Sequence, residues 1–300
     1  MKSRRVGAYG ICRDDSGRVL LARNSHLSSF PGRWTLPGGG VEQGEHPDDT
    51  VVREFGEETG LSVRVDALHT VTADVFRLPG GDFEHTDRIV YDVSATGGVL
   101  RAEASGTTES AEWVSPARAA ELPLMPFTAA VLGLAAAESD KPGADEGLVR
   151  PDRVQRFGAY AAATDPAGRI LLARIAAGYP GAGRWHLPGG GTDHGETPEI
   201  ALARELTEET SQHGRVTGLL GVSHRYDPAA LGPEGVPIDW HVIRVLFRVQ
   251  VDAPTEPVVT EEAGGSTAEA RWFTPAEAGH LALTEPAATA VARIGKETAR

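Results

Sequence analysis

Two short segments of the chain each gather three glutamates at a spacing that suits metal binding. Glu54, Glu57 and Glu58 lie at positions i, i+3 and i+4 of a predicted helix. Their counterparts, 151 residues later in the chain, are Glu205, Glu208 and Glu209. Since an α-helix turns about 100° per residue, three such side chains fan over about a quarter of its circumference. Carboxylate oxygens grouped in this way are ligands that Mg²⁺ or Mn²⁺ prefers, together with substrate phosphates. The pattern therefore predicts the capture of a divalent metal against a phosphate chain.

An ordinary acidic helix face is the alternative explanation for these glutamates. Like charges at this spacing disfavour a helix by about 0.2–0.5 kcal/mol per pair, and a solvated face more often alternates Glu with Lys. Only Arg53 relieves the repulsion, and it is also a natural partner for Glu45 upstream. The second segment repeats this pair as Arg204 and Glu196. Because the same Arg and Glu positions recur, the metal-binding interpretation is favoured.

The glutamates need a helix that begins just upstream and packs on a core. Pro47 stands where a helix favours its first residue. Val52, Phe55 and Thr59 form one stripe that is expected to face the core. The equivalent positions in the second segment are Ala203, Leu206 and Thr210. Ahead of the helix, residues 36–40 are rich in glycine, which lets the backbone approach closely, so a carbonyl oxygen there could complete a metal shell.

The wider sequence is an internal repeat. Positions 32–58 and 183–209 share 15 of 27 residues when they are aligned without a gap. A chain of 300 residues with this long period fits two duplicated domains, each large enough for its own core. We place the domains at residues 1–137 and 154–300, and we interpret the polar stretch 138–153 as the linker.

Each half shows the pattern of strands layered with helices. Two strand-like runs come first, and the glycine-rich loop, the glutamate helix and further strands follow. Ala-rich helices are expected at Thr128–Ala137 and Ala287–Ile294. The order predicts an α/β domain with a mixed sheet in each half. Eight extra residues in the second half are expected around Asp227–Pro237, at the tip of a long hairpin or loop.

The bulk composition excludes some classes of function. A net charge of −13 argues against a nucleic-acid scaffold, which needs a basic surface, but it permits a polyanionic small substrate whose charge is neutralised by metal. Cys12 is the only cysteine, so no intrachain disulfide can form, and this usage is typical of the cytoplasm. No segment approaches the length of a membrane span. We therefore expect a cytoplasmic protein without a membrane or nucleic-acid partner.

Both segments resemble the NUDIX box, G-x5-E-x7-R-E-U-x-E-E-x-G-U, in which U is a bulky apolar residue. The first copy, at residues 39–61, fills every position with Gly39, Glu45, Arg53, Glu54, Phe55, Glu57, Glu58, Gly60 and Leu61. The second copy, at residues 190–212, fits with Gly190, Glu196, Arg204, Glu205, Leu206, Glu208 and Glu209. It departs at Ser211 and Gln212, which replace the final glycine and the final apolar residue.

The resemblance implies two consecutive NUDIX-like α/β/α sandwich domains. It also implies a hydrolase that uses Mg²⁺ or Mn²⁺ to cleave a nucleoside diphosphate linked to another moiety. By position, the residues that bind metal or orient the attacking water would be Gly38 (through its carbonyl), Glu54, Glu57 and Glu58, with Gly189, Glu205, Glu208 and Glu209 as counterparts. Arg53 and Arg204 would hold Glu45 and Glu196 in place. The family varies in its general base, which leaves open a distant-loop glutamate, either Glu109 or Glu112, or Glu261, Glu262 or Glu269.

The departures in the second box raise the question of whether both halves turn over. Ser211 would adopt the left-handed geometry of Gly60 only with strain of about 1 kcal/mol, or else the helix runs on to Gly214. Gln212 loses an apolar anchor. Neither change removes a predicted ligand, so we expect metal binding in both halves and turnover in the first, with the second active, slower or used for recognition.

The sequence leaves the substrate open. ADP-ribose-like compounds, nucleotide sugars, dinucleoside polyphosphates and nucleoside triphosphates all fit. Arg23 and Arg174 end a strand near the predicted site, where they would grip phosphate or be ordinary exposed cations. A nucleotide sensor without turnover is a second hypothesis, and an RNA-end pyrophosphohydrolase is less favoured by the acidic charge. Since many NUDIX enzymes are homodimers, the two halves would form an intramolecular pseudo-dimer.

Overall fold

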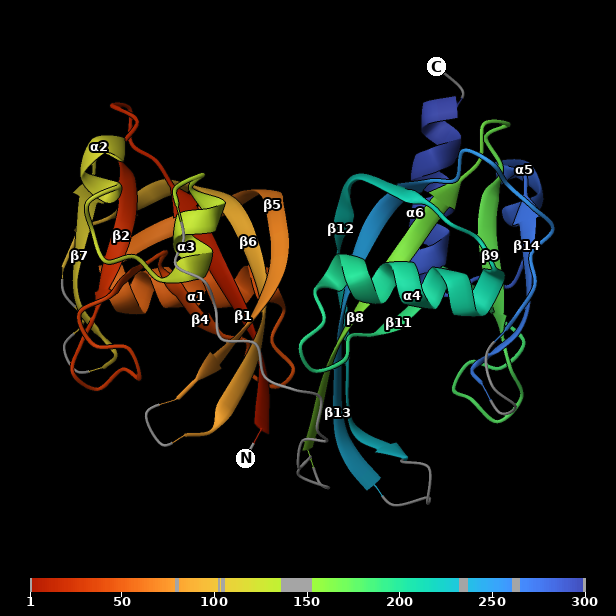
Figure 1. Cartoon of the computed structure of the whole chain (residues 1–300), viewed down its shortest axis with the longest axis horizontal. Coiled ribbons are helices and arrows are strands. Elements are labelled where there is room, and N and C mark those ends of the chain that lie inside the picture. The colour runs from red at the N-terminus through yellow and green to blue at the C-terminus, as the bar shows by residue number, and fades with distance from the viewer. Residues whose placement is uncertain are drawn as a thin grey trace. The chain divides into compact units, whose positions relative to one another are not determined.

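The structure is a computed structural model that describes residues 2–78, 81–101, 103, 106–135, 153–231, 237–260 and 265–298. The chain divides into two compact units (Figure 1). The first comprises residues 1–155 and 225–241, and the second comprises residues 156–224 and 242–300. The predicted linker at 138–153 lies, except for Arg153, outside the described residues. No helix within the described ranges is long and apolar enough to cross a membrane.

The first repeat consists of two sheets and three helices. Its elements are β1 (Lys2–Cys12), β2 (Val19–Asn24), β3 (Trp34–Thr35), β4 (Gly38–Gly40), α1 (Pro47–Thr59), β5 (Leu61–Arg77), β6 (Phe83–Gly98), β7 (Thr108–Val114), α2 (Pro116–Ala119) and α3 (Pro126–Val131). One sheet has the order β4-β1-β6-β5, and the other has the order β3-β2-β7. Strands β1 and β6 are parallel whereas β4 and β5 pair antiparallel with their neighbours, so the first sheet is mixed, as predicted.

Helices cover both faces of this sheet. Successive residues of a strand point to opposite faces. Tyr9 and Ile11 of β1 share a core with Phe127 of α3. Gly10, between them, lies against the Phe55 ring of α1, where a Cβ atom would stand only 2.6 Å from the ring. The sheet is therefore sandwiched between α1 and α3, which confirms the predicted α/β/α layering.

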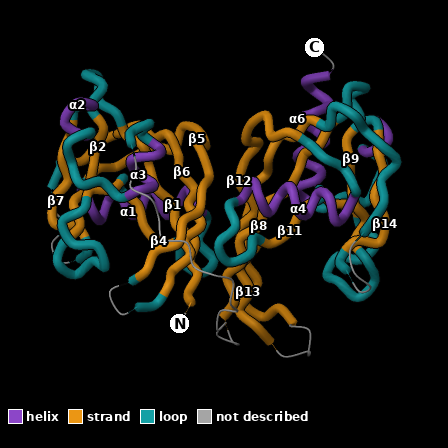
Figure 2. Tube along the Cα trace, viewed as in Figure 1, coloured by secondary structure: helices purple, strands orange, loops and turns teal. Residues whose placement is uncertain are grey.

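The second repeat follows the same element order (Figures 1 and 2). Its elements are β8 (Arg153–Thr164), β9 (Ile170–Ile175), β10 (Trp185–His186), β11 (Gly189–Gly191), α4 (Pro198–Thr210), β12 (Arg215–Leu231), β13 (Pro237–Gln250), β14 (Thr267–Phe273), α5 (Pro275–Ala278) and α6 (Glu285–Thr298). The sheet order is β10-β9-β8-β13-β12, with β11 paired to β8 and β14 paired to β9. Ala287, Ala290 and Val291 of α6 pack on one face of these strands.

The predicted extra residues around Asp227–Pro237 overlap the end of β12 and the start of β13, and residues 232–236 lie outside the described part. Residues 225–241 belong to the first compact unit. Within that unit, the Gln43 side-chain amide donates to the backbone and side-chain oxygens of Asp239, at 3.1 Å each. The Gly44 amide donates to Nδ1 of His241 at 3.2 Å. These bonds hold the loop that precedes α1.

Two details of the predicted helices are wrong. Val52 is 42% exposed and Ala203 is also exposed, whereas Val51 and Leu202, one position earlier on each helix, are fully buried. The buried stripe therefore contains Glu58 and Glu209, which the sequence pattern placed on a polar face. The first C-terminal helix ends at Val131 instead of continuing to Ala137, because Gly133 adopts a positive φ of 70° two residues later.

Candidate active site

Helix α1 begins and ends at residues that favour helix ends. The His46 side chain accepts a hydrogen bond from the Asp48 amide, and Pro47 occupies the first turn. Gly60 ends the helix in the left-handed conformation, with φ 73°. In the second repeat, Thr197 caps α4 by accepting from the Ile200 amide. Both helices have 13 residues, so equivalent glutamates occupy equivalent turns.

The Glu58 carboxylate is buried at the point where α1 meets β4, and two donors hold it. The Gly38 amide donates to Oε2 at 2.9 Å, and the Thr108 hydroxyl donates to Oε1 at 2.6 Å. Burial raises the pKa of Glu58 to about 8, because it opposes the charged form more strongly than these hydrogen bonds favour it. The carboxylate is thus fixed in orientation beside the glycine-rich strand.

Arg53 binds the other glutamates of the box. Its Nε donates to Glu45 at 2.9 Å, and its Nη1 donates to Glu54 at 2.9 Å and to Glu57 at 3.2 Å. Its Nη2 reaches the Gly40 carbonyl at 3.2 Å. Burial would raise the pKa of Glu45, but hydrogen bonds, first among them those from Arg53, hold it below its usual range. Burial raises the pKa of Glu54. Arg53 therefore joins the loop, the strand and the helix.

The second unit builds the same arrangement from the equivalent residues. The Gly189 amide donates to Oε2 of Glu209 at 2.8 Å, and the Thr267 hydroxyl donates to Oε1. Arg204 donates to Glu196, Glu205, Glu208 and the Gly191 carbonyl. In each unit, the box arginine therefore contacts three of the four box glutamates, and the fourth is held by the glycine before the box and by a threonine of a later strand.

The glycine-rich strand is packed against a glutamate. A Cβ atom added at Gly39 would overlap the Glu54 carboxylate, whereas one added at Gly56, on α1 itself, would meet nothing within 4 Å. We therefore expect Gly39→Ala to displace Glu54 and to lower first-site turnover by about tenfold or more, since small misplacements of catalytic groups are costly. Gly56→Ala, the matched control, should keep full activity and stabilise the chain by about 0.5–1 kcal/mol. Kinetics and urea unfolding of both variants check this, and equal activity of the two would contradict it.

The family is decided by comparison with known proteins. The model of the NUDIX domain matches residues 1–132 and again residues 154–294. The chain belongs to the NUDIX family. The two matches agree with the duplication, and the first one contains the complete box.

Individual relatives match parts of the chain. An ADP-ribose pyrophosphatase of Methanocaldococcus jannaschii is 39% identical over 97 residues, which are 32% of this chain and 54% of that protein. A putative 8-oxo-dGTP diphosphatase of Bacillus subtilis is 35% identical over 113 residues, which are 37% of this chain and 67% of that protein. The match with the M. jannaschii protein thus spans about half of that protein's length. A crystal structure of a MutT NUDIX hydrolase from Burkholderia pseudomallei is 29% identical and covers 44% of this chain and 97% of that one, with a TM-score of 0.37.

The end of the second NUDIX box is rebuilt instead of lost. Helix α4 stops at Thr210, and Ser211 does adopt a positive φ, 54°, so the helix does not run on to Gly214. The Ser211 hydroxyl donates to the Val258 carbonyl at 2.8 Å. Gln212 is 1% exposed, and its amide group both donates to Thr255 at 2.9 Å and accepts from the Thr255 backbone at 3.0 Å. A polar anchor has replaced the apolar one.

Restoring the family pattern at this position should harm the fold. Gln212→Leu would remove both hydrogen bonds between the Gln212 amide group and Thr255, so we expect it to lower the free energy of unfolding by about 1–3 kcal/mol. Gln212→Glu, which keeps the acceptor but loses the donor, should fall between the wild type and the leucine variant. Urea unfolding measures both effects. A leucine variant as stable as the wild type would show that Gln212 is not an anchor.

Glu103 is a functional candidate that the sequence did not indicate. Its charge acts on Glu58 and raises the pKa of that carboxyl after the larger effect of burial. Its Oε2 accepts from the Thr108 amide at 3.0 Å, and the hydroxyl of the same threonine binds Glu58. Glu103 lies in a segment with no helical or strand pattern, so only its position just before β7 could have pointed to it.

The glutamates proposed from sequence as distant general bases are engaged elsewhere. Glu109 accepts from Arg23 at 3.0 Å, and Glu112 accepts from Arg118 at 3.3 Å. In the second unit Glu269 pairs with Arg174 at 2.7 Å. Glu261 and Glu262 lie outside the described residues. Arg23 and Arg174, predicted to grip phosphate, are thus each held by a carboxylate on the neighbouring strand.

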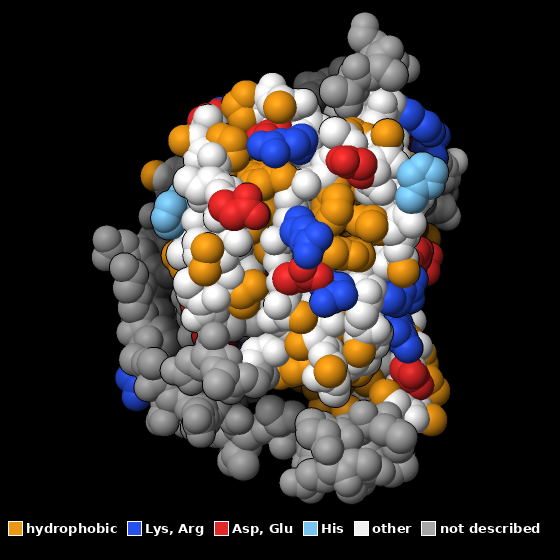
Figure 3. Space-filling view, turned by 90° about the vertical axis from the view of Figure 1, so that its right-hand side faces the viewer, with side chains coloured by type: hydrophobic (Ala, Val, Ile, Leu, Met, Phe, Trp, Pro, Cys, Tyr) orange, Lys and Arg blue, Asp and Glu red, His pale blue; other side chains and the backbone are white. Residues whose placement is uncertain are grey.

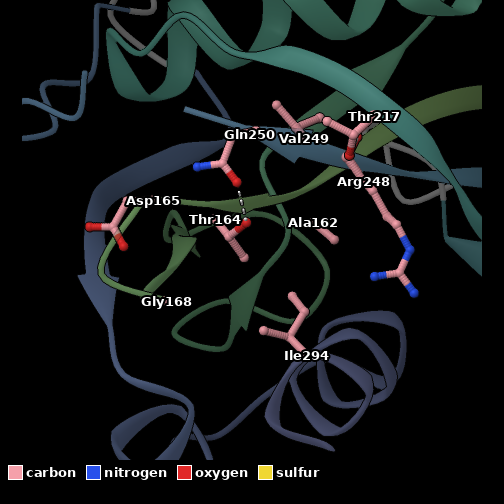
Figure 4. A pocket seen from close by; sticks show the side chains of 9 residues that line it. All are labelled: Ala162, Thr164, Asp165, Gly168, Thr217, Arg248, Val249, Gln250 and Ile294. Atoms are coloured by element: carbon pink, nitrogen blue, oxygen red, sulfur yellow. Dashed lines mark hydrogen bonds between the residues drawn. The ribbon is translucent and has the colours of Figure 1, made fainter. Parts of the chain in front are cut away.

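The face shown in Figure 3 and a cavity in the second unit do not point to other chemistry. On the face shown in Figure 3, acidic and basic side chains are interspersed, without a basic stripe. A cavity of about 360 Å³ in the second unit is lined by Thr164, Asp165, Arg248, Gln250 and Ile294, among others (Figure 4). It includes none of the box residues, and Asp165 is satisfied by the turn that it caps. The glutamates therefore remain the better candidate, because their donor chemistry is specific.

The box residues fit a divalent metal by type but have not converged on one. In the described part of the chain, no three acidic, histidine or cysteine side chains stand close enough to hold an ion together. Arg53 holds both Glu54 and Glu57. Mg²⁺ binds through one or two carboxylates, substrate phosphates and retained waters, so the site matches its needs once a substrate is present. Glu54, Glu57, Glu58 and the Gly38 carbonyl are the groups that would hold it.

Proposed function

We propose that the chain hydrolyses the pyrophosphate bond of a nucleoside diphosphate linked to another moiety, using Mg²⁺ or Mn²⁺. The observation that carries this proposal is the duplicated setting of Glu58 and Glu209. Each is buried, and each accepts from the amide of the glycine just before its box and from a threonine hydroxyl of a later strand. A surface made only for solubility would not bury a carboxylate twice in the same way.

The residues of the first site divide the work of hydrolysis among them. Bound Mg²⁺ would supply the charge neutralisation and water activation that attack on a pyrophosphate needs. Gly38 and Thr108 fix both oxygens of Glu58. Arg53 holds Glu54 and Glu57 near one another until the substrate enters. Glu103 lies beside Glu58 and has no ion-pair partner among the described residues, so it is our candidate to take the proton of the attacking water.

The substrate class is proposed from the relatives and from the net charge. The relatives include proteins named for hydrolysis of ADP-ribose and of 8-oxo-dGTP, both of which contain the bond in question. ADP-ribose-like compounds, nucleotide sugars, dinucleoside polyphosphates and nucleoside triphosphates form the set to test. The acidic balance of the chain disfavours RNA ends.

A substrate panel tests the proposal. The full chain is incubated with each compound and Mg²⁺, and release of phosphate or nucleoside monophosphate is followed. We expect turnover that stops with chelator and returns with Mg²⁺ or Mn²⁺, and Glu103→Gln should lower it in a Glu209→Gln background. Tight binding of a panel compound without any product would instead favour a nucleotide-sensing module.

We also propose domain boundaries at residues 1–137 and 154–300 and an intramolecular pseudo-dimer of the two. The two matched regions support the boundaries. The pairing is proposed by analogy with family members that are homodimers. Limited proteolysis should cut first within 138–153, and the fragments should then elute together on size exclusion. Early cuts elsewhere, or separate elution, would contradict the boundaries or the pairing. A cytoplasmic location stays a prediction from the single cysteine.

A further inference from the structure

The second unit contains a buried nitrogen that has no protein partner. His186, on β10, lies three residues before Gly189, and its Nε2 atom is shielded from solvent without a hydrogen bond within the described part of the chain. Burial, and next the charge of Arg244, lower the pKa of His186 to about 4, so the ring is neutral. A buried polar atom left unpaired costs about 1–3 kcal/mol. A bound ligand that donates a hydrogen bond to this nitrogen would explain why the protein leaves it without a partner.

Arg244, on β13, is the second unmatched group. Its guanidinium stands 6.0 Å from the centroid of the Tyr160 ring and interacts with the Tyr160 hydroxyl. Among the described ion pairs of the chain, none joins Arg244 to a carboxylate. An arginine offers five donors in a planar fork, and Tyr160 uses only part of this capacity. Arg244 can therefore bind an acceptor that the protein itself does not provide.

These groups lie close to the metal-binding residues of the same unit. Tyr160 on β8 pairs directly with Gly189 on β11, and the Gly189 amide donates to Glu209. A ligand whose phosphates reach Glu209 would thus place its remaining part near Arg244 and His186.

The first unit has the same framework with every group satisfied. Arg88, which interacts with Tyr9 as Arg244 does with Tyr160, is held by Asp74 at 2.9 Å and by the Tyr9 hydroxyl at 2.6 Å. Its guanidinium lies 4.1 Å from the Phe127 ring centroid. The residue equivalent to His186 at the offset of 151 is Thr35, whose hydroxyl meets that of Thr128 at 3.3 Å.

The contrast lies in the partner of each arginine. Asp74 pairs with Arg88, whereas no ion pair among the described residues gives Arg244 a carboxylate partner. The polar groups are neutralised within the protein in one site and are left for a ligand in the other. A site built to hydrogen-bond a ligand group rejects analogues that lack it. The two sites should therefore differ in what they accept.

We infer that Arg244 and His186 bind the nucleobase edge of the substrate in the second site, with Arg244 donating to a base acceptor and His186 accepting from the N–H beside it. This rests on the proposed function for the identity of the site as a nucleotide site. In the first site, Arg88 and Thr35 already have hydrogen-bond partners within the protein, so that site does not bind the base in this way. The two sites are then specific for different nucleotides instead of being redundant copies.

Kinetics of the full chain with the first site silenced test this inference. In a Glu58→Gln background, Arg244→Ala should raise KM for the preferred nucleotide at least about tenfold, with a much smaller change in kcat. Arg244→Lys, which keeps the charge but loses the fork, should recover only part of the loss. His186→Phe should change the ratio of kcat/KM between nucleotides with different bases. In a Glu209→Gln background, the same substitutions should leave first-site kinetics unchanged.

Direct binding separates failure of this inference from failure of the proposed function. Calorimetry on the Glu58→Gln, Glu209→Gln double variant measures the binding of AMP, GMP, UMP and ribose 5-phosphate with Mg²⁺. Binding of a nucleotide that is lost in Arg244→Ala supports the inference even if no compound is turned over. Turnover in the second site with KM unaffected by Arg244→Ala would overturn it. Ribose 5-phosphate that binds as tightly as the nucleotides, with the same dependence on Arg244, would overturn the assignment to the base.

Discussion

Replacing both Glu58 and Glu209 with glutamine is expected to lower hydrolysis by about 10²-fold or more, because each unit loses a carboxylate that would hold the metal in place. Glutamine has the size of glutamate, and its amide oxygen can still accept from the Gly38 amide. Its amide nitrogen can turn the Thr108 hydroxyl into an acceptor. The geometry of the site should therefore survive while one carboxylate is removed from each unit. Steady-state kinetics on the best compound of the panel measure the loss.

Stability provides the control for this double variant. Because Glu58 and Glu209 are 6% and 1% exposed, their carboxylates are held at a desolvation cost that glutamine does not carry. The free energy of unfolding without metal should be unchanged or slightly higher. A variant that loses activity and also unfolds much more readily would indicate a structural role for the glutamates, and full activity would exclude them from the chemistry.

The single variants apportion activity between the halves. If both sites turn over the same compound, each single variant should lose the activity of its own site and keep the activity of the other site. If the sites differ in specificity, each variant should lose a different set of compounds from the panel. Loss of all activity in Glu58→Gln alone would show that the second site does not turn over the panel compounds.

The parts of the fold that were predictable are those where one residue type has a single good location. Pro47 begins a helix, Gly60 ends one, and the box spacing brings Arg53 to Glu45. The α/β/α layering followed from the resemblance and from the order of strand and helix patterns. The sequence pattern placed the buried stripe of the helix one residue off. It took Val52 as buried because Val52 is apolar, and Glu58 as exposed because Glu58 is charged. Hydrophobic periodicity alone would not bury a glutamate.

Features that depend on contacts between distant segments could not be predicted. Glu103 lies 45 positions from Glu58 in sequence and meets it through Thr108. Gln212 is an anchor only because Thr255 lies opposite. Arg88 is paired with a carboxylate, Asp74, which lies on another strand, whereas Arg244 has no such partner among the described residues. Two copies with nearly the same box can thus differ in the residues around it.

Removing Arg53 is the second change with a large expected effect. Its side chain is 27% exposed, and those of Glu45 and Glu54 are each 15% exposed, so the network is only partly open to solvent. Breaking a fully buried pair costs about 3–5 kcal/mol and an exposed pair costs about 1 kcal/mol or less, which puts Arg53→Ala at about 2 kcal/mol of lost stability. Turnover in a Glu209→Gln background should fall by about 10²-fold, because the glutamates lose the group that positions them.

Conservative and exposed substitutions control for this effect. Arg53→Lys keeps the charge but cannot bond to Glu45, Glu54 and Glu57 together, so its stability and activity should lie between those of wild type and alanine. Arg118→Ala removes an exposed pair with Glu112 in the same unit and should change stability by no more than about 0.5 kcal/mol. Equal losses in the Arg53 and Arg118 variants would show that the box network has no special role.

The pH dependence of unfolding gives this prediction a separate signature. Hydrogen bonds from Arg53 hold the pKa of Glu45 below its usual range against the opposing effect of burial. A carboxyl with a depressed folded pKa contributes stability above its unfolded pKa, and this contribution is lost as the pH falls through the folded value. In Arg53→Ala the pKa of Glu45 should rise, so the first unit should lose less stability than wild type on acidification. Urea unfolding at a series of pH values below neutrality measures the slope, and parallel slopes for the two proteins would mean that Arg53 does not set the protonation of Glu45.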